Sequence, residues 1–306
     1  MINYIKHERI DKSRWDECIE DSGHDFIYAM SWYLDIVAPS WDALVLDNYQ
    51  AVMPLTYRTK MGIKYIFTPL YAQQLGVFAK KPDEKLCLDF IGSLPAEFRI
   101  IDLKMNESNS LPAHLTGWRK KINYTLDIGT HYDAVRKGYN RNCIRNLKKA
   151  TDVGLKPGEC LSAEEFALFI GENLRDRMRE LKPQHLELLS KITGECLQRK
   201  RAEIVCIRND KDKVVAAGSF LSMGERIIFS VCASTQEGRK NQAMYMLVDE
   251  QIKKCAGRYR VFDFSGSEIK GIAYFNSTFG AKPVQYPFIH INRLNLLQRL
   301  ISGKIN

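Results

Sequence analysis

Near its end, the chain of 306 residues carries the segment Phe262-Asp263-Phe264-Ser265-Gly266-Ser267. The aromatic residues favour a buried β-strand, and the Ser-Gly-Ser tripeptide after them favours a turn. A long amphipathic helix precedes the strand, with apolar residues from Met244 to Cys255 on one side. A short helix through Phe275 and a strand over 284–289 follow. The predicted order is helix, strand, short helix, strand.

Upstream of this segment, the pattern predicts two helices and then three strands. Ser162 and Glu165 have the spacing of a capping box, and apolar residues then repeat every three or four positions. A second helix is expected over 183–200. The strands are expected over 203–207, 214–221 and 226–232, and a polar loop over 234–242 leads into the long helix.

The first part of the chain also alternates between helix and strand signals. A helix is expected over 13–20 and a hairpin over 42–58. Further strands are expected over 64–69, 75–79, 98–103 and 122–127, with a short helix from Pro82 to about Leu94. After a capping box at Thr130, one helix is expected, with an apolar stripe from Val135 to Leu147 at i+4 spacing.

The composition is that of an ordinary globular protein, with 45% hydrophobic and 26% charged residues. The length suits two domains of about 150 residues each. No apolar stretch approaches a membrane span, and the charged N-terminus does not resemble a signal peptide, so we expect a cytoplasmic monomer or dimer. The eight cysteines are scattered without metal-ligand spacing, which predicts reduced thiols and no metal. The net charge of +9 favours anionic partners.

The element order, with the motifs around it, resembles the FemAB-like branch of the GNAT N-acyltransferase superfamily. The matching motifs are Phe262–Ser267, Gly271, Tyr274–Asn276 and Phe279–Ala281. The basic run Arg141–Ala150 and the loop Pro69–Gly76 are similar to that branch as well. The resemblance implies an α/β (α+β) fold of two tandem GNAT-like domains with mixed central sheets. We place a degenerate domain at 1–128 and a donor-binding domain at 129–306.

The donor site is expected where the polar loop meets the long helix. Ordinary GNATs bind the pyrophosphate of acyl-CoA with a Q/R-x-x-G-x-G/A loop, whereas the stretch from Gly238 here lacks the paired glycines. The helix N-terminus and the basic side chains before it still favour an anion. The expected cofactor-binding residues are Arg239, Lys240, Asn241, Gln242 and Ala243. The alternative is a solvated basic loop. The resemblance leaves both acyl-CoA and aminoacyl-tRNA open as donors.

Acyl transfer to an amine needs a base and a hydrogen-bond donor for the oxyanion. Asp263 is the candidate base, or it orients the amine; the alternative is that it caps the turn after its strand. Tyr286 is the candidate acid for the leaving group, and its alternative role is packing. The candidate substrate-binding residues of this segment are Ser265, Ser267, Tyr274 and Asn276.

Two further groups are candidate contacts of the acceptor. Tyr71, Gln73 and Gln74 could line a cleft between the halves, or they could form a polar surface turn. Arg141 and Arg145 lie on a basic stripe that could contact an acidic acceptor or RNA phosphate, or that is simply a solvated helix face.

The function predicted from these residues is N-acyl transfer from a thioester or ester donor to an amine acceptor. The acceptor is expected to be a small molecule or a cell-wall precursor, which would make the function cell-envelope related. The alternative is a non-catalytic, degenerate GNAT module that binds a nucleotide-linked or anionic ligand. RNA binding by the basic helix alone is weaker, because exposed aromatic residues are not interleaved with its charges.

Overall fold

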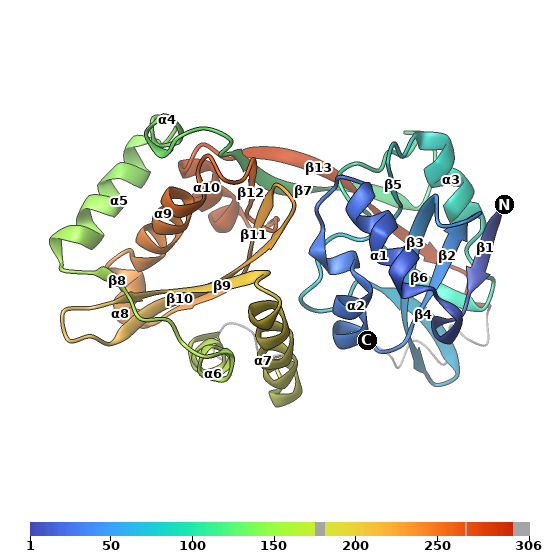
Figure 1. Ribbon diagram of the computed structural model, residues 1–306, viewed down its shortest axis with the longest axis horizontal. Helices are drawn as coiled ribbons and strands as arrows, with labels where there is room; N and C mark the ends of the chain where they lie inside the picture. Colours follow the sequence, from blue (N-terminus) through green and yellow to red (C-terminus); the bar gives the residue numbers. More distant parts are fainter. Residues whose placement is uncertain (175–180, 267, 296–306) are drawn as a thin grey trace. The chain divides into compact units, whose positions relative to one another are not determined.

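The computed structural model describes residues 1–174, 181–266 and 268–295. The chain forms two compact units (Figure 1). The first comprises Met1–Lys121 together with the segment that begins at Gln285, and the second comprises Ile122–Val284. The predicted domain boundary at 128/129 lies close to the point, after Lys121, where the chain passes from the first unit to the second. The segment from Gln285, which we placed in the second domain, belongs to the first unit. The sequence did not reveal that the chain returns to the first unit, because a terminal strand carries no local sign of the sheet that it joins.

The first unit is built on a mixed sheet. Its strand order is β1-β2-β3-β4-β6-β13, with β5 paired to β3; β4 and β6 are parallel, and the other pairs are antiparallel. The elements are β1 (Ile2–Ile5), α1 (Lys12–Asp21), α2 (Ser31–Val37), β2 (Trp41–Leu46), β3 (Ala51–Lys60), β4 (Ile63–Phe67), β5 (Phe78–Ala79), α3 (Glu84–Gly92), β6 (Phe98–Lys104) and β13 (Lys282–Asn292). Short 3-10 turns lie at His7–Arg9 and Ile27–Ala29.

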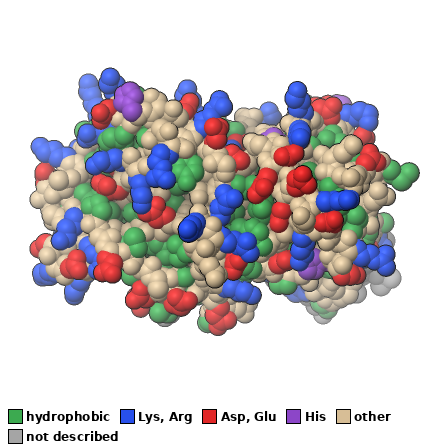
Figure 2. All heavy atoms as spheres, in the orientation of Figure 1, with side chains coloured by type: hydrophobic (Ala, Val, Ile, Leu, Met, Phe, Trp, Pro, Cys, Tyr) green, Lys and Arg blue, Asp and Glu red, His purple; other side chains and the backbone are tan. Residues whose placement is uncertain are grey.

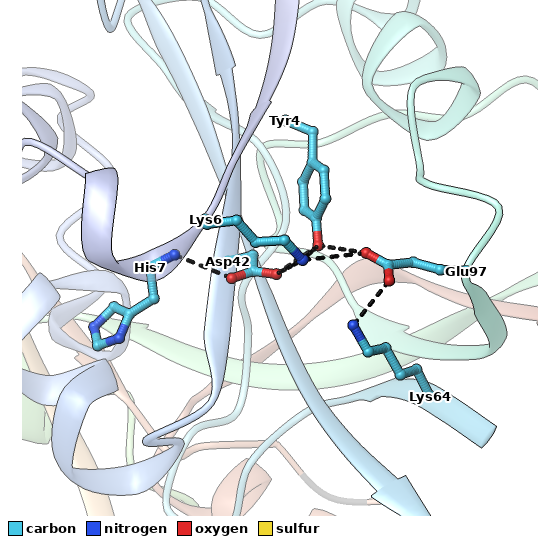
Figure 3. Close-up of polar contacts among 6 residues, drawn as sticks. All are labelled: Tyr4, Lys6, His7, Asp42, Lys64 and Glu97. Carbon is cyan, nitrogen blue, oxygen red and sulfur yellow. Dashed lines mark hydrogen bonds and ion pairs between the residues drawn. The ribbon is translucent and has the colours of Figure 1, made fainter. Parts of the chain in front are cut away.

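A network of charged groups crosses the strands of this sheet (Figure 3). The buried carboxylate of Asp42 accepts hydrogen bonds from the Tyr4 hydroxyl at 2.5 Å and from the Lys6 ammonium at 3.0 Å. The Tyr4 hydroxyl also lies 2.7 Å from Glu97, so the two carboxylates share its one proton, and Glu97 accepts from Lys64 at 2.8 Å. Hydrogen bonds from Lys64 and Tyr4 lower the pKa of Glu97 to about 2. The network is a compensated ion cluster that ties β1 and β2 to β4 and to the turn before β6.

The second unit carries a second mixed sheet, in the order β7-β12-β11-β10-β9-β8. The three strands β9, β10 and β11 are antiparallel, as predicted, and β11 and β12 are parallel. The elements are β7 (Trp118–Asp127), α4 (Tyr132–Arg136), α5 (Arg141–Asp152), β8 (Lys156–Gly158), α6 (Ala163–Leu174), α7 (Pro183–Gln198), β9 (Ala202–Arg208), β10 (Val214–Met223), β11 (Arg226–Ser234), α8 (Gln236–Lys240), α9 (Ala243–Cys255), β12 (Val261–Asp263) and α10 (Lys270–Thr278).

Helices cover both faces of this second sheet. Figure 1 shows α5 and α9 on one side of β9–β11 and α6 and α7 on the other. The buried cluster beneath α5 and α9 contains Leu147, Phe220, Leu247 and Phe262. The capping box at Ser162 is confirmed, because Glu165 N donates to Ser162 Oγ and Ser162 N donates to Glu165 Oε2.

The single helix expected after Thr130 is wrong, because the chain forms two helices, α4 and α5. The second helix begins after Asn140, whose side chain accepts a hydrogen bond from Cys143 N and so caps α5. The capping box at Thr130 is also absent, since the residue that caps α4 is His131 and its side chain makes no capping bond. Within the described residues, no helix is long and apolar enough to cross a membrane.

Candidate active site

The parallel strands β11 and β12 separate soon after they meet. Their pairing covers only Arg226–Ile228 of β11 and Val261–Asp263 of β12. A β-bulge lies at this point on the other edge of β11, because Ser219 pairs with Val231 and Phe220 with Phe229, which leaves Ser230 unopposed. Bulges bend a strand and increase its twist. β11 therefore continues to Ser234 with no strand of the described chain on the edge that faced β12.

A pocket of about 400 Å³ opens where the two strands diverge. Its walls come from β11, the turn after β12, the start of α9, the end of α6 and α10. The lining residues include Ser230, Cys232, Ser234, Arg239, Ser265 and Asn276. A pocket at the carboxyl ends of diverging parallel strands is a usual ligand site in α/β proteins.

Among the polar residues that line the pocket, Asn276 is the most deeply buried. It is 2% exposed, and its Nδ2 has no hydrogen-bond partner among the described residues. Aromatic packing fixes its helix in place: the rings of Phe275 and Phe279 lie 4.8 and 5.6 Å from that of Tyr245 in α9. A buried amide without a partner costs roughly 1–3 kcal/mol, so a ligand carbonyl would relieve this cost.

Asp263 does not face the pocket. Its side chain is fully buried, and Oδ2 accepts a hydrogen bond from Arg226 Nη1 at 2.5 Å. Oδ1 accepts from Asn123 Nδ2 at 3.0 Å and from Ser265 N at 2.7 Å. Ser265 has a left-handed φ of +57°, which an L-residue rarely adopts. The carboxylate therefore holds the strained turn that forms one pocket wall, which agrees with the capping alternative.

The titratable groups of the pocket are few. Among the described lining residues there is no carboxylate, imidazole or lysine. Burial raises the pKa of the Cys232 thiol to about 12, so this sulfur remains protonated at neutral pH and is a poor nucleophile. The described chain contains no cluster of metal-ligating side chains. Among the described lining residues, the walls thus offer hydrogen-bond donors and the guanidinium of Arg239.

No protein-family model and no curated protein matches the sequence. Among solved structures, the chain is similar to FemX, with a TM-score of 0.67, 11% identity and 99% of both chains covered. It is similar to the C-terminal domain of a putative lysylphosphatidylglycerol synthetase from Agrobacterium fabrum (TM-score 0.57, 10% identity, 95% of this chain and 96% of that one). It is also similar to a tandem GNAT protein from the clavulanic acid biosynthesis pathway (TM-score 0.55, 10% identity, 96% and 99%).

The chain has the tandem GNAT fold. The α/β class with mixed sheets, predicted from sequence, is confirmed, and the FemAB-like resemblance is confirmed at the level of the fold. At these identities the likeness concerns the fold.

The predicted anion-binding residues of the second unit lie together beside the pocket. Arg239 and Lys240 are exposed at the end of α8, and Arg239 Nη1 donates to Ser234 O at 2.6 Å. Asn241 follows α8, and Gln242 precedes α9 with a left-handed φ of +63°. Ala243 begins α9, whose first N–H groups have no partner within the helix. The turn α8 was not predicted, although Thr235 caps it by accepting from Gly238 N.

The other predicted site residues of this unit are spread out. Ser265 lines the pocket with Asn276, whereas Tyr274 is 57% exposed on α10. Ser267 lies outside the described residues. Arg141 and Arg145 are exposed on α5, where Arg145 Nη2 donates to Asn142 Oδ1, which agrees with a solvated face.

Three predicted residues belong to the first unit. Tyr286 is 5% exposed in β13, which agrees with its alternative role in packing. Tyr71 has a left-handed φ of +67°, and burial raises the pKa of its hydroxyl to about 12. Gln73 Oε1 is buried without a hydrogen-bond partner among the described residues. The acceptor role of Tyr71 and Gln73 stays a prediction.

Sequence reasoning missed Ser230 and Cys232, because nothing local marks the point where a strand loses its neighbour. Gln74, which the sequence analysis grouped with Gln73, has a side-chain amide that is fully buried and lacks partners within the described chain. Its role as an acceptor contact also stays a prediction.

Proposed function

We propose that the protein is an N-acyltransferase whose second unit binds the activated carbonyl of the donor between β11 and β12. The observation that carries the proposal is Asn276, a buried amide donor in the pocket without a partner among the described residues. An amide N–H aimed at a carbonyl oxygen stabilises the oxyanion that forms when an amine attacks.

The surroundings of Asn276 suit a phosphorylated carrier. The open edge of β11 offers backbone N–H and C=O groups to an extended arm, as in β-strand addition. Arg239, Lys240 and the first turn of α9 favour a phosphate. Acyl-CoA and aminoacyl-tRNA both present phosphate together with a thioester or an ester. The acceptor is an amine on a small molecule or on a cell-wall precursor.

The pocket favours direct transfer rather than an acyl-enzyme. A neutral amine attacks the donor carbonyl, Asn276 Nδ2 stabilises the oxyanion, and the carrier thiol or hydroxyl leaves. Cys232 is protonated and does not form a covalent intermediate. In this proposed scheme the amine proton leaves to solvent. Asp263 acts as a positioning residue through the turn at Ser265.

Calorimetric titration with acetyl-CoA and with alanyl-tRNA tests the proposal. We expect one of them to bind with a micromolar Kd. We expect Asn276→Ala to slow transfer from that donor by about 10²–10³-fold, the usual effect of losing one oxyanion donor. Ser277→Ala is the matched control, since Ser277 is exposed on the same helix. Binding of neither donor, or full activity in Asn276→Ala, would overturn the proposal.

A further inference from the structure

Two cysteines meet in the second unit, away from the pocket between β11 and β12. Gly158 of β8 pairs with Cys206 of β9, and Cys160 follows two residues later. The register therefore brings Cys160 to the edge of β9 that carries Cys206. Both line a cavity of about 500 Å³ between this sheet edge and α9. Cys160 is exposed, whereas the other seven cysteines are buried or half-buried.

The environment of the pair separates the two thiols chemically. The hydrogen bond from Cys206 lowers the pKa of Cys160 to about 7, against the opposing effects of burial and of Glu203 and with help from Lys254 and Arg208. The same hydrogen bond, together with burial, raises the pKa of Cys206. Glu250 and Lys253 also line the cavity. Near neutral pH a large share of Cys160 is therefore thiolate beside the protonated Cys206, and the thiolate is the reactive form.

We propose that Cys160 and Cys206 are a redox-active pair, in which a peroxide oxidises Cys160 and Cys206 then closes a disulfide. The Cys160 thiolate attacks one peroxide oxygen, the O–O bond breaks, and a sulfenic acid and hydroxide form. Cys206 sulfur then attacks the Cys160 sulfur and displaces hydroxide, which leaves as water with the Cys206 proton. With hydrogen peroxide, two thiols yield one disulfide and two waters, and the sulfurs lose two electrons. The bond joins the segment before α6 to β9.

Mass spectrometry of the full-length protein after treatment with hydrogen peroxide tests this pairing. We expect the mass to fall by two hydrogens, a linked Cys160–Cys206 peptide to appear, and dithiothreitol to reverse both changes. Cys160→Ser and Cys206→Ser should abolish the link. Cys255→Ser should keep it, because Cys255 of α9 is not among the residues that line this cavity, and its sulfur accepts from Gln251. Direct oxidation of Cys160 to the sulfinic acid, with Cys206 still free, would refute the pair.

Alkylation by iodoacetamide gives a second, independent measurement. The labelling rate of Cys160 should have its midpoint near pH 7 in the wild type. In Cys206→Ala the midpoint should rise toward about 8.5, the value of an ordinary cysteine. An unchanged midpoint would show that Cys206 does not activate Cys160. Neither measurement depends on transferase activity, so the outcome is separate from that of the proposed function.

Discussion

Replacing Asp263 with Asn should destabilise the second unit rather than remove a base. The change deletes the negative charge that Arg226 Nη1 contacts at 2.5 Å, and Arg226 is only 7% exposed. The two carboxylate oxygens of Asp263 accept from three donors, on Arg226, Asn123 and Ser265. Asn has only one acceptor oxygen, so it cannot serve all three.

The magnitude follows from the burial of the pair. Breaking a buried ion pair by removing one partner costs about 3–5 kcal/mol, because the remaining charge loses the opposite charge beside it. We expect the lower end, about 3 kcal/mol, since Asn keeps the shape and one acceptor. A domain of 150–250 residues loses roughly 2–4 °C of Tm per kcal/mol, so Tm should fall by roughly 6–12 °C.

Thermal unfolding followed by circular dichroism measures this change. Asp127→Asn is the control, because Asp127 is exposed on the neighbouring strand β7 and accepts only a local bond from Gly129 N. Changing both partners, with Arg226→Met and Asp263→Leu, should recover much of the loss. If Asp263→Asn melted with the wild type and yet lost acyl transfer, the positioning role would be wrong and the base role right.

Two further changes test the packing and the charge network. Gly238→Ala should lower the free energy of unfolding by about 1–3 kcal/mol, measured with urea, because the added Cβ would lie 2.1 Å from Val215 O. Gly92→Ala is the control, because a Cβ there would have no atom within 4 Å. Equal urea midpoints for the two variants would contradict the tight packing at Gly238. Glu97 has a pKa lowered from 4.5 to about 2, so its stabilisation is present above pH 4.5 and is lost as the pH falls toward 2. The urea midpoints of wild type and Glu97→Gln should therefore converge over that range, and a constant difference would show that the Glu97 charge is not responsible.

The fold was predictable where the signals are local. The capping box at Ser162 and the strands from 203 to 232 were placed correctly, because hydrophobic periodicity and turn residues act over a few positions. The interruption of the helix before Asn140 was missed because Val135, Tyr139 and Cys143 are all buried, as residues on one face of a continuous helix would be. Two short helices that present the same face to one core keep the i+4 stripe of a single helix. Only the cap at Asn140 distinguishes them.

The site was less predictable, because it depends on where partners from distant parts of the chain lie. The pocket exists because β11 and β12 pair over only three residues and then separate. The length of this pairing depends on the register of the two strands, which neither strand's own sequence shows. A carboxylate at a strand end, next to serines, is a reasonable base until its neighbours are known. Asn123 lies 140 positions before Asp263 and Arg226 lies 37 positions before it, and together with Ser265 N they occupy both carboxylate oxygens. Asp263 is therefore committed to holding the pocket wall. The oxyanion role that we propose for Asn276 rests instead on an amide that the fold buries without a partner among the described residues.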